Sequence, residues 1–411
     1  MTLPPQSPDT ASTSLRGYTR GMAGFALLLF ASTWKLWTPQ DVFPQIPFLA
    51  SLITTPTSVD WICLGLAASG LVICLFAKEG KALNTALILF ALPTIVLILL
   101  DQHRLQPWAY QLVVLAIVIA TSTKLNAVRR IQVITVSIYI FSGVSKLDYQ
   151  FVHTVGDQML STLIGIFGLT TENWPTQIRN SAVLCFPTAE IFIGVGLLIP
   201  KIRNYAVASA VVMHTVLLVL LFNDVSGSGV LIWNLFFIFQ IIWIFYRQPK
   251  PKPKPKPKPK LTPTANHSLL DSIGYLVTLG VVTFPLTQPM GICDHWPAWQ
   301  VYAPRCSRAK LESPIENNEL WNNFGQWSNQ TLAVPVYPQA RFEFAVAVAA
   351  QQKFNPSRGL SIEISEASNR WDGTRISKRI AGDQIKMQTR EYWLNTRARN
   401  TWTNKGNDKR Q

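Results

Sequence analysis

Long apolar runs separated by short polar segments dominate the hydrophobic pattern of the chain. A helix crosses the hydrocarbon core of a membrane with about 20 apolar residues. The pattern predicts spans at residues 21–37, 61–77, 83–100, 109–123, 130–146, 181–199, 204–222, 229–246 and 268–287. The apolar run 157–169 is too short to cross, so we expect a re-entrant or interfacial helix there. The predicted fold class is an all-α polytopic membrane helical bundle of about eight or nine spans.

Beyond residue 288 the long apolar runs give way to shorter patterned segments. Polar and apolar residues alternate at 334–337, 341–348 and 360–365, which predicts strands with one buried face. Asp372-Gly373 favours a hairpin turn, and the polar, aromatic segment 317–330 predicts a short helix. We expect residues 288–411 to form a small extracytoplasmic α+β domain that docks on the bundle or on a partner, with a frayed end after residue 400.

Composition supports this division of the chain. Hydrophobic residues make up 48% and charged residues 14%, which is low for a soluble protein. Residues 1–15 are rich in Pro, Ser and Thr and are expected to be disordered; we expect the first span to be retained rather than cleaved. Residues 16–246 form the predicted bundle. The linker 247–267 contains six Pro-Lys repeats, which predict an extended polyproline-II tether that anionic lipid attracts.

The basic residues behind the net charge of +15 lie mainly in short loops, in the Lys-Pro linker and in the C-terminal tail, and those of the bundle fall in alternate connecting segments. Because Lys and Arg favour the cytoplasmic side, we predict a cytoplasmic N-terminus and an extracytoplasmic C-terminal domain in a bacterial plasma (inner) membrane. Membrane lipids are then the expected partners of the basic residues. Nucleic acid is not expected, because no aromatic residues interleave with the lysines of the linker. The basic residues that define the orientation are Arg16, Arg20, Lys78, Lys81, Lys124, Arg129, Arg130, Lys201 and Arg203.

Cysteine placement is the first candidate chemistry. Cys63, Cys74 and Cys185 lie in spans, where packing is the simplest role. Cys293 and Cys306 lie just beyond the last span, on the side where export permits disulfides. We predict that they form a bridge, with two unrelated thiols as the alternative. The sequence contains no metal-ligand spacing and no phosphate-binding glycine loop, so no metal is predicted.

Polar residues at and inside the spans form the remaining candidates. Asp101 and Arg104 are three residues apart, which suits an ion pair at a rigid corner or at a substrate mouth. Glu190 and His214 lie on consecutive spans at similar depth, which predicts a hydrogen bond between them; the alternative is that each is a separately satisfied buried group. Asn234 is interpreted as a hydrogen-bonding contact between helices, or as a further supporting polar residue.

Lys146 is the most informative of these residues, because it sits where an apolar run ends at the predicted outer face. The small residues Ser142 and Gly143 precede it and would let a helix or a flat ligand approach. Desolvation can make a buried lysine usable as a general base. The alternative is a lysine that reaches the interface and pairs with Asp148 or Asp157.

The segment Phe141-Ser-Gly-Val-Ser-Lys-Leu-Asp-Tyr-Gln-Phe151 resembles a motif of vitamin K-dependent gamma-carboxylases and of their bacterial relatives with the HTTM (horizontally transferred transmembrane) domain. The order of Leu100-Asp101, Glu190, Arg203 and His214 is similar as well, and the likeness covers roughly residues 15–246. The Asp-Gln-x-Arg-x-Gln-Pro-Trp segment at 101–108 and the Asp-His-Trp-Pro-Ala-Trp segment at 294–299 look like those of a bacterial branch, for which HTTM-like or DoxX-like labels are used.

The resemblance implies that Lys146 deprotonates a reduced quinone and that His214 is a supporting polar residue. The activity so implied is a quinol-dependent oxygenation or carboxylation, with a vitamin K-like quinol as cofactor. The chain departs from the family at Ser145, where a lysine is usual, at Phe151, where tryptophan is usual, and in lacking the large lumenal domain. The alternative function is a non-enzymatic, DoxX-like accessory subunit that packs on a membrane redox or export complex through a protein partner at the outer face.

Overall fold

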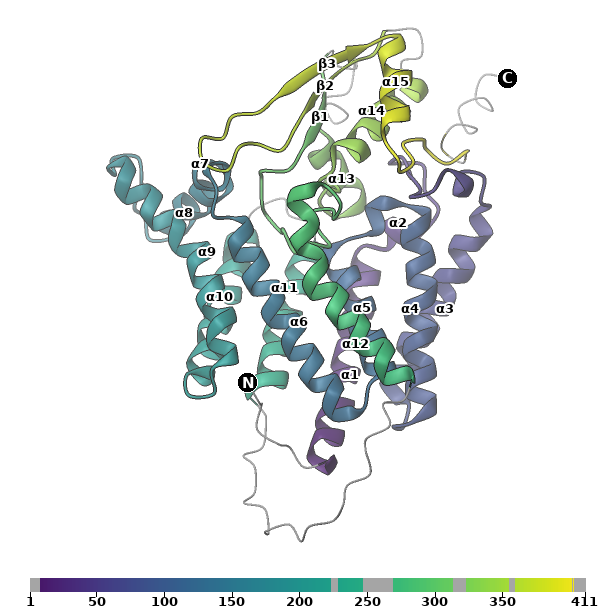
Figure 1. Ribbon diagram of the computed structural model, residues 1–411, viewed down its shortest axis with the longest axis vertical. Coiled ribbons are helices and arrows are strands. Elements are labelled where there is room, and N and C mark those ends of the chain that lie inside the picture. The colour runs from purple at the N-terminus through teal and green to yellow at the C-terminus, as the bar shows by residue number, and fades with distance from the viewer. Residues whose placement is uncertain are drawn as a thin grey trace.

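The computed structural model describes residues 8–222, 228–246, 269–312, 323–354, 359–400 and 402. The described chain is mostly helical and contains one three-stranded sheet. Figure 1 shows the long helices standing side by side, with the sheet and α13–α15 gathered at one end. The Lys-Pro linker, the start of the predicted helix 317–330 and nearly all of the last residues lie outside the described residues.

Seven helices within the described ranges are long and apolar enough to cross a membrane. They are α3 (Thr57–Phe76), α4 (Lys81–Leu100), α6 (Lys124–Ser145), α9 (Thr176–Leu198), α10 (Arg203–Phe222), α11 (Ser228–Ile241) with its π-helical extension η3 (Ile242–Tyr246), and α12 (Leu269–Thr283) with its 3-10 extension η4 (Phe284–Met290). The two other predicted spans correspond to the 25-residue α1 (Pro8–Ser32) and the 15-residue α5 (Pro107–Thr121). The number of spans beyond these seven stays a prediction.

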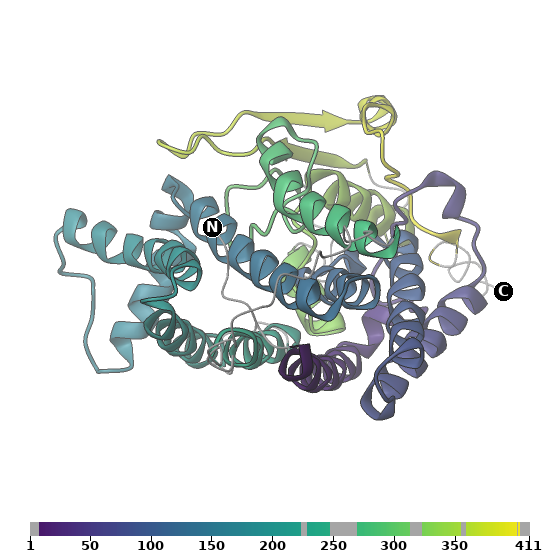
Figure 2. The ribbon, with the colours of Figure 1, turned by 60° about the horizontal axis from the view of Figure 1, so that its bottom comes forward.

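Helix-to-helix contacts run around the bundle in the order α6, α9, α10, α11, α1, α3, α4, α5 and α12, and α12 packs back on α6. In Figure 2 the teal helices α9 and α10 form one flank, and the dark blue helices α3 and α4 form the opposite one. Short elements connect the helices at the end near the sheet: α2 (Trp34–Trp37), η1 (Ala50–Leu52), η2 (Gln102–Arg104), α7 (Tyr149–His153) and α8 (Val155–Gly165).

Helix starts differ from the apolar runs for local reasons. The sequence predicts disorder through residue 15, but α1 already begins at Pro8. Helix α6 begins six residues before its predicted span, because the Thr123 side chain accepts the backbone N–H of Asn126 and caps a polar first turn. Helix α8 overlaps the short apolar run 157–169: it begins two residues before the run and ends at Gly165, and the exposed side chain of Phe167 follows it. The placement of this helix at a membrane surface stays a prediction.

The C-terminal segment contains β1 (Arg308–Leu311), β2 (Ser361–Ser365), β3 (Ser377–Ala381), α13 (Phe324–Leu332), α14 (Ala340–Phe354) and α15 (Asp383–Glu391). The strands form an antiparallel sheet in the order β1-β2-β3, with Ile362 opposite Ile380. The strand predicted at 360–365 is confirmed as β2. The turn at Asp372-Gly373 lies in the connection from β2 to β3, where Gly373 has φ +72°.

Two predicted strands of this segment are wrong. Residues 334–337 are irregular, and residues 341–348 lie in the helix α14. The alternating Phe342, Phe344 and Val346 are all buried, but so are Ala345 and Ala347 between them. A helix buried on most of its surface has no polar stripe, so its apolar residues can mimic the two-residue period of a strand.

The predicted Cys293–Cys306 disulfide is also wrong in this structure, because both thiols are free and buried. The two cysteines have different surroundings. The Cys293 sulfur lies 3.4 Å from the carbonyl oxygen of Asp294, whereas the Cys306 sulfur has Arg308 beside it.

A buried cluster of three charges fastens the C-terminal segment to the bundle. Asp60 at the start of α3 accepts Nη1 of Arg104 at 2.7 Å and Nη1 of Arg399 at 2.8 Å, and all three side chains are fully buried. The predicted Asp101–Arg104 ion pair is therefore wrong. Asp101 instead accepts the backbone N–H groups of Ile46 and His103, so it caps the turn η2 that aims Arg104 at Asp60.

We predict that Asp60→Asn destabilises the protein strongly, because it leaves two buried guanidinium groups without a carboxylate. Breaking such a buried pair costs about 3–5 kcal/mol. Thermal and denaturant unfolding in detergent or nanodiscs measures the loss. Glu391→Gln is the matched control: it breaks the exposed Lys378–Glu391 pair, and a cost of at most about 1 kcal/mol is expected. Equal costs for the two variants would contradict the role of the cluster.

A second prediction concerns Glu343 of α14. Its Oε2 accepts the backbone N–H of Ala309 at 2.6 Å, and burial raises the pKa of this carboxyl to about 7, against the opposing effects of that hydrogen bond and of Arg308. In the unfolded chain this carboxyl has a pKa near 4.3. Between that value and the folded pKa of about 7, the folded state therefore binds more protons than the unfolded state. Stability should therefore fall as pH rises from about 4.5 to 7, by up to about 3 kcal/mol. Glu343→Gln should flatten that slope in pH-dependent unfolding, and a slope unchanged by the substitution would count against it.

Candidate functional site

Lys146 and Glu190 meet because helices α6 and α9 cross with very little space between them. A Cβ atom added at Gly143 of α6 would lie 2.7 Å from the carbonyl oxygen of Pro187 in α9. A Cβ atom added at Gly194 of α9 would lie 3.1 Å from the Tyr139 side chain of α6. Small residues at such positions let helix backbones approach closely. The glycines therefore bring the end of α6 within reach of the carboxylate on α9.

The ammonium of Lys146 is fully committed to three acceptors. It donates to Oε1 and Oε2 of Glu190 at 2.7 and 2.8 Å, and to Oγ of Ser142 at 2.7 Å. A protonated lysine has three N–H donors, so none remains for another acceptor. The Lys146 side chain is 5% exposed and that of Glu190 13%. Lys146 is also the C-terminal cap of α6, where the helix dipole favours a positive charge.

His214 of α10 lies in a second hydrogen-bonded cluster. Its Nδ1 is 2.8 Å from Oδ1 of Asn234 on α11, and its Nε2 is 2.6 Å from the Tyr139 hydroxyl on α6. The Asn234 amide nitrogen donates to the Val230 carbonyl, so its oxygen faces the histidine. Because that oxygen can only accept, Nδ1 carries the proton and Nε2 accepts from Tyr139. This neutral tautomer fits the burial of all three side chains.

Two cavities meet at the ion pair. The lateral cavity, of about 830 Å³, lies between α8, α9 and α10, and both Lys146 and Glu190 line it. Its lining is mostly apolar and includes the exposed Phe192 and Val212, so it opens at the outer surface of the bundle. The inner chamber, of about 50 Å³, has a lining that combines apolar side chains such as Met213, Leu217 and Phe237 with the polar Ser142, Lys146, Glu190, Tyr139, His214 and Asn234. The ion pair therefore lies between a large lateral cavity and a small chamber that a second group of polar side chains also lines.

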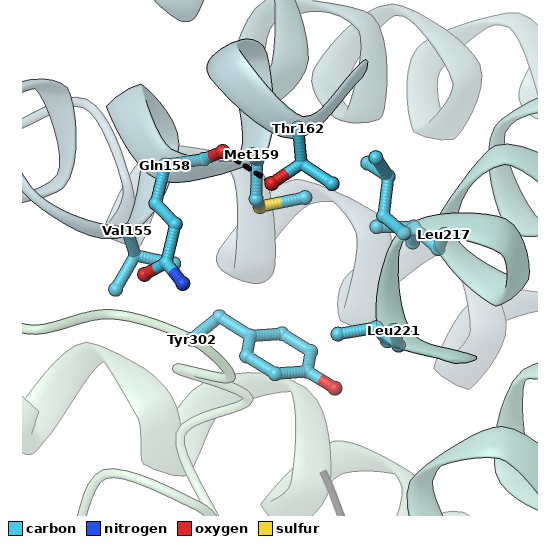
Figure 3. A pocket seen from close by; sticks show the side chains of 8 residues that line it. Val155, Gln158, Met159, Thr162, Leu217, Leu221 and Tyr302 are labelled. Carbon is cyan, nitrogen blue, oxygen red and sulfur yellow. Dashed lines mark hydrogen bonds between the residues drawn. The ribbon is translucent and has the colours of Figure 1, made fainter. Parts of the chain in front are cut away.

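Tyr302 borders both cavities and belongs to the loop that follows α12. It also lines a third cavity of about 250 Å³, where Figure 3 shows its ring below Met159 of α8 and beside Leu221 of α10. The residue has a φ of 58°, which is uncommon for a side chain of this size. Such backbone conformations persist only where the surrounding structure holds them in place. The loop thus covers the end of the site that lies nearest the sheet.

Predicted partners within this site are partly wrong. Glu190 binds Lys146 rather than His214, and His214 binds Tyr139 and Asn234. The first alternative partner of Lys146, Asp148, caps α7 by accepting the Phe151 backbone N–H, and the second, Asp157, pairs with Arg179. The two helices do place Glu190 and His214 at comparable depth, because both residues line the inner chamber. The pairing of Lys146 with Glu190 was not predicted, because the carboxylates near Lys146 in the sequence, Asp148 and Asp157, were the expected partners.

Sequence reasoning missed Tyr139 as a site residue, although a signal was present. Tyr139, Ser142 and Lys146 follow one another at spacings of three and four, which places them on one face of α6. No comparable signal pointed to Tyr302, because a loop distant in sequence brings it in. The predicted supporting residues Asp101 and Arg104 line neither cavity and serve the C-terminal contact instead.

Within the described residues, no group of three or more His, Cys, Asp or Glu side chains could hold a metal ion. The lateral cavity has the size and lining of a site for an organic molecule. Comparison of the chain with protein-family models, with curated proteins and with solved structures gave no match.

We predict strong coupling between Lys146 and Glu190 in stability. Lys146→Met or Glu190→Leu alone leaves one buried charge without its partner, at a cost of about 3–5 kcal/mol. The double variant removes both charges, so its cost should fall well below the sum of the single costs. A double-mutant cycle of unfolding free energies measures this coupling. Additive costs would show that the pair does not interact, and the half-exposed Arg179–Asp157 pair provides the control cycle, with little coupling expected.

Proposed function

We propose that this chain is a membrane-embedded protein that binds a lipid-soluble quinol in the lateral cavity and takes up a proton from it through the Lys146–Glu190 pair. One observation carries the proposal: an apolar cavity that opens at the surface of the bundle ends at a buried ion pair. A charged pair at this depth needs a reason, since ionisable residues inside membrane helices are costly and usually functional.

The residues present fit a quinol. Its ring and hydrocarbon tail require an apolar space, and its hydroxyl groups require partners at one end. The lateral cavity offers an apolar wall from α9 and α10, with Glu190 and Lys146 as polar groups. Its volume of about 830 Å³ lies in the range of sites for organic ligands. Access from the side suits a ligand that arrives through the membrane. When bound, a quinol supplies two electrons and two protons.

Proton uptake follows from the geometry of the pair. As an ammonium with three acceptors, Lys146 has no lone pair to offer. Transfer of one Nζ proton to Glu190 converts the ion pair into a neutral amine and a neutral carboxylic acid, without any change of net charge. The amine can then accept one proton from outside the pair, so the pair as a whole gains one positive charge. Lys146 is the base in this scheme, and Glu190 is the group that prepares it.

His214 has a supporting role. It reaches neither Lys146 nor Glu190 by a hydrogen bond, but it holds the Tyr139 hydroxyl on the same chamber. Neutral and fixed by Asn234, it adds a polar side chain to the inner chamber without adding a further charge. The resemblance to gamma-carboxylases and HTTM proteins supports quinol-dependent oxygenation or carboxylation as the reaction class. The departure at Ser145, whose hydroxyl donates to the Ser142 carbonyl, leaves one amine at the helix end.

The arrangement of charges supports a bacterial inner-membrane orientation with the N-terminus in the cytoplasm. The starts of α4 and α6 and the connection between α9 and α10 place Lys81, Lys124, Arg129 and Lys201 toward the end at which α1 starts, whereas the sheet lies at the opposite end. The positive-inside rule counts basic residues in short loops next to the spans, and by that count this end is cytoplasmic. The C-terminal segment is then extracytoplasmic, on the side where Lys146 lies.

The test is quinone retention in nanodiscs, measured by mass spectrometry and by fluorescence quenching with added menaquinone or ubiquinone. Ser209→Trp fills the lateral cavity that Ser209 lines, and binding should fall at least about tenfold. Ser69→Trp places the same side chain on an exposed face of α3 and should leave binding unchanged. Folded Lys146→Met should lose quinol-dependent proton uptake. Wild-type protein that binds neither quinone, or equal binding by the two tryptophan variants, would refute the proposal.

The accessory-subunit alternative has one specific observation in its favour. Trp371 and Trp393 in the C-terminal segment are 82% and 84% exposed. Exposed tryptophans are frequent anchors in protein interfaces. A partner subunit that co-purifies with the wild type but is lost in Trp371→Ser, together with indifference to Lys146→Met, would favour this alternative.

A further inference from the structure

A second polar cavity lies at the opposite end of the bundle from the sheet, between the starts of α6 and α12. It has a volume of about 530 Å³ and is lined by Asn126, Arg129, Arg130, Asp271, Ser272 and Tyr275. None of these residues belongs to the proposed quinol site. Gly274 allows α12 to come this close, because a Cβ atom there would lie 2.7 Å from Nη1 of Arg130.

The hydrogen bonds inside this cavity leave one positive charge in excess. Arg130 donates to both carboxylate oxygens of Asp271, at 3.1 and 3.0 Å. Asp271 also accepts the Asn126 amide and the backbone N–H of Thr123. The pair is therefore a fixed, neutralised unit. Arg129 makes no ion pair or side-chain hydrogen bond within the described part of the chain, and it lines the cavity with its charge unneutralised.

Two helix N-termini add to this charge. Helix α6 begins at Lys124 and α12 begins at Leu269, so both direct the positive ends of their dipoles toward the cavity. The positive end of a helix dipole and a cationic side chain both favour a bound anion. The planar guanidinium of Arg129 suits phosphate oxygens, which it can bind through two N–H groups. The chemistry thus favours a phosphate-type anion.

The surroundings of the cavity identify the source of that anion. Tyr275, Leu276 and Leu279 on α12 are 57%, 61% and 44% exposed, and Tyr275 and Leu279, four residues apart, continue the helix face that lines the cavity. A soluble phosphate would gain nothing from such a face, whereas acyl chains would pack along it. Tyr275 lies where an aromatic ring suits the headgroup level of a bilayer.

We infer that this cavity binds the headgroup of an anionic phospholipid, with Arg129 on the phosphate and the acyl chains along α12. The site is independent of the proposed quinol function and lies at the other end of the bundle. A lipid bound there would contact both α6 and α12 and so hold the start of α12 against α6.

The test is lipid retention by the full chain, exchanged into nanodiscs or detergent with phosphatidylglycerol or phosphatidylcholine and examined by native mass spectrometry. Wild-type protein should retain phosphatidylglycerol in preference. Arg129→Gln should weaken that retention roughly fivefold, the effect of about 1 kcal/mol from one arginine at a membrane surface. Arg129→Lys should restore part of it. Lys201→Gln removes an exposed charge at the same end, outside the cavity, and should change little.

Excess inorganic phosphate separates the two sources of the anion. Retention that persists in phosphate supports a lipid held by both headgroup and chains. Displacement of phosphatidylglycerol by phosphate alone would overturn the lipid assignment and leave a simple anion site. Equal loss in Arg129→Gln and Lys201→Gln would overturn the site itself, because general surface charge would then account for the retention.

Discussion

Two buried ion-paired clusters, one at Asp60 and one at Lys146, constrain how the helices and the C-terminal segment pack. Asp60 joins two arginines from distant parts of the chain, Arg104 and Arg399, and all three side chains are removed from solvent. Lys146 and Glu190 obey the same constraint on the other flank, where two glycines permit the close crossing of α6 and α9. A single unpaired buried charge is costly. A shift of α6 against α9 would separate Lys146 from Glu190, and a shift of the C-terminal segment would separate Arg399 from Asp60, so both contacts are held in place.

The two clusters nevertheless differ in what they can do. Both carboxylate oxygens of Asp60 accept hydrogen bonds from arginine side chains. Arginine keeps its proton at all accessible pH values, so this cluster can hold the C-terminal segment on the bundle but cannot transfer a proton. The second cluster pairs a carboxylate with an amine, and both groups can change protonation state. It also borders two cavities, whereas Asp60 lines neither. This contrast is the physical reason why the proposed proton uptake involves Lys146, whereas Asp60 has a structural role.

Sequence patterns identified the apolar helices well, because a long run without charges favours a membrane-spanning helix over any soluble element. They failed where burial removes the polar stripe, as in α14, whose phenylalanines at every second position resemble a strand. They also failed for pairs that depend on packing. The spacing of Asp101 and Arg104 favoured a local pair, but the arginine instead binds a second carboxylate, that of Asp60 on α3. Glu190 and His214 were placed at the right depth, yet depth alone does not determine which neighbouring helix supplies the partner.

The contact between the β2–β3 hairpin and α7 has a consequence for how the outer surface relates to the ion pair. The backbone N–H of Tyr149 donates to the Arg370 carbonyl, and the Gln150 amide donates to the Gly373 carbonyl. Helix α7 begins only three residues after Lys146, at the end of α6. The hairpin tip is therefore connected to Lys146 through α7. If the tip moves, either these two hydrogen bonds break or the end of α6 moves with it. A partner that binds the exposed Trp371 at that tip would therefore change the position of the buried Lys146–Glu190 pair if it displaced the tip.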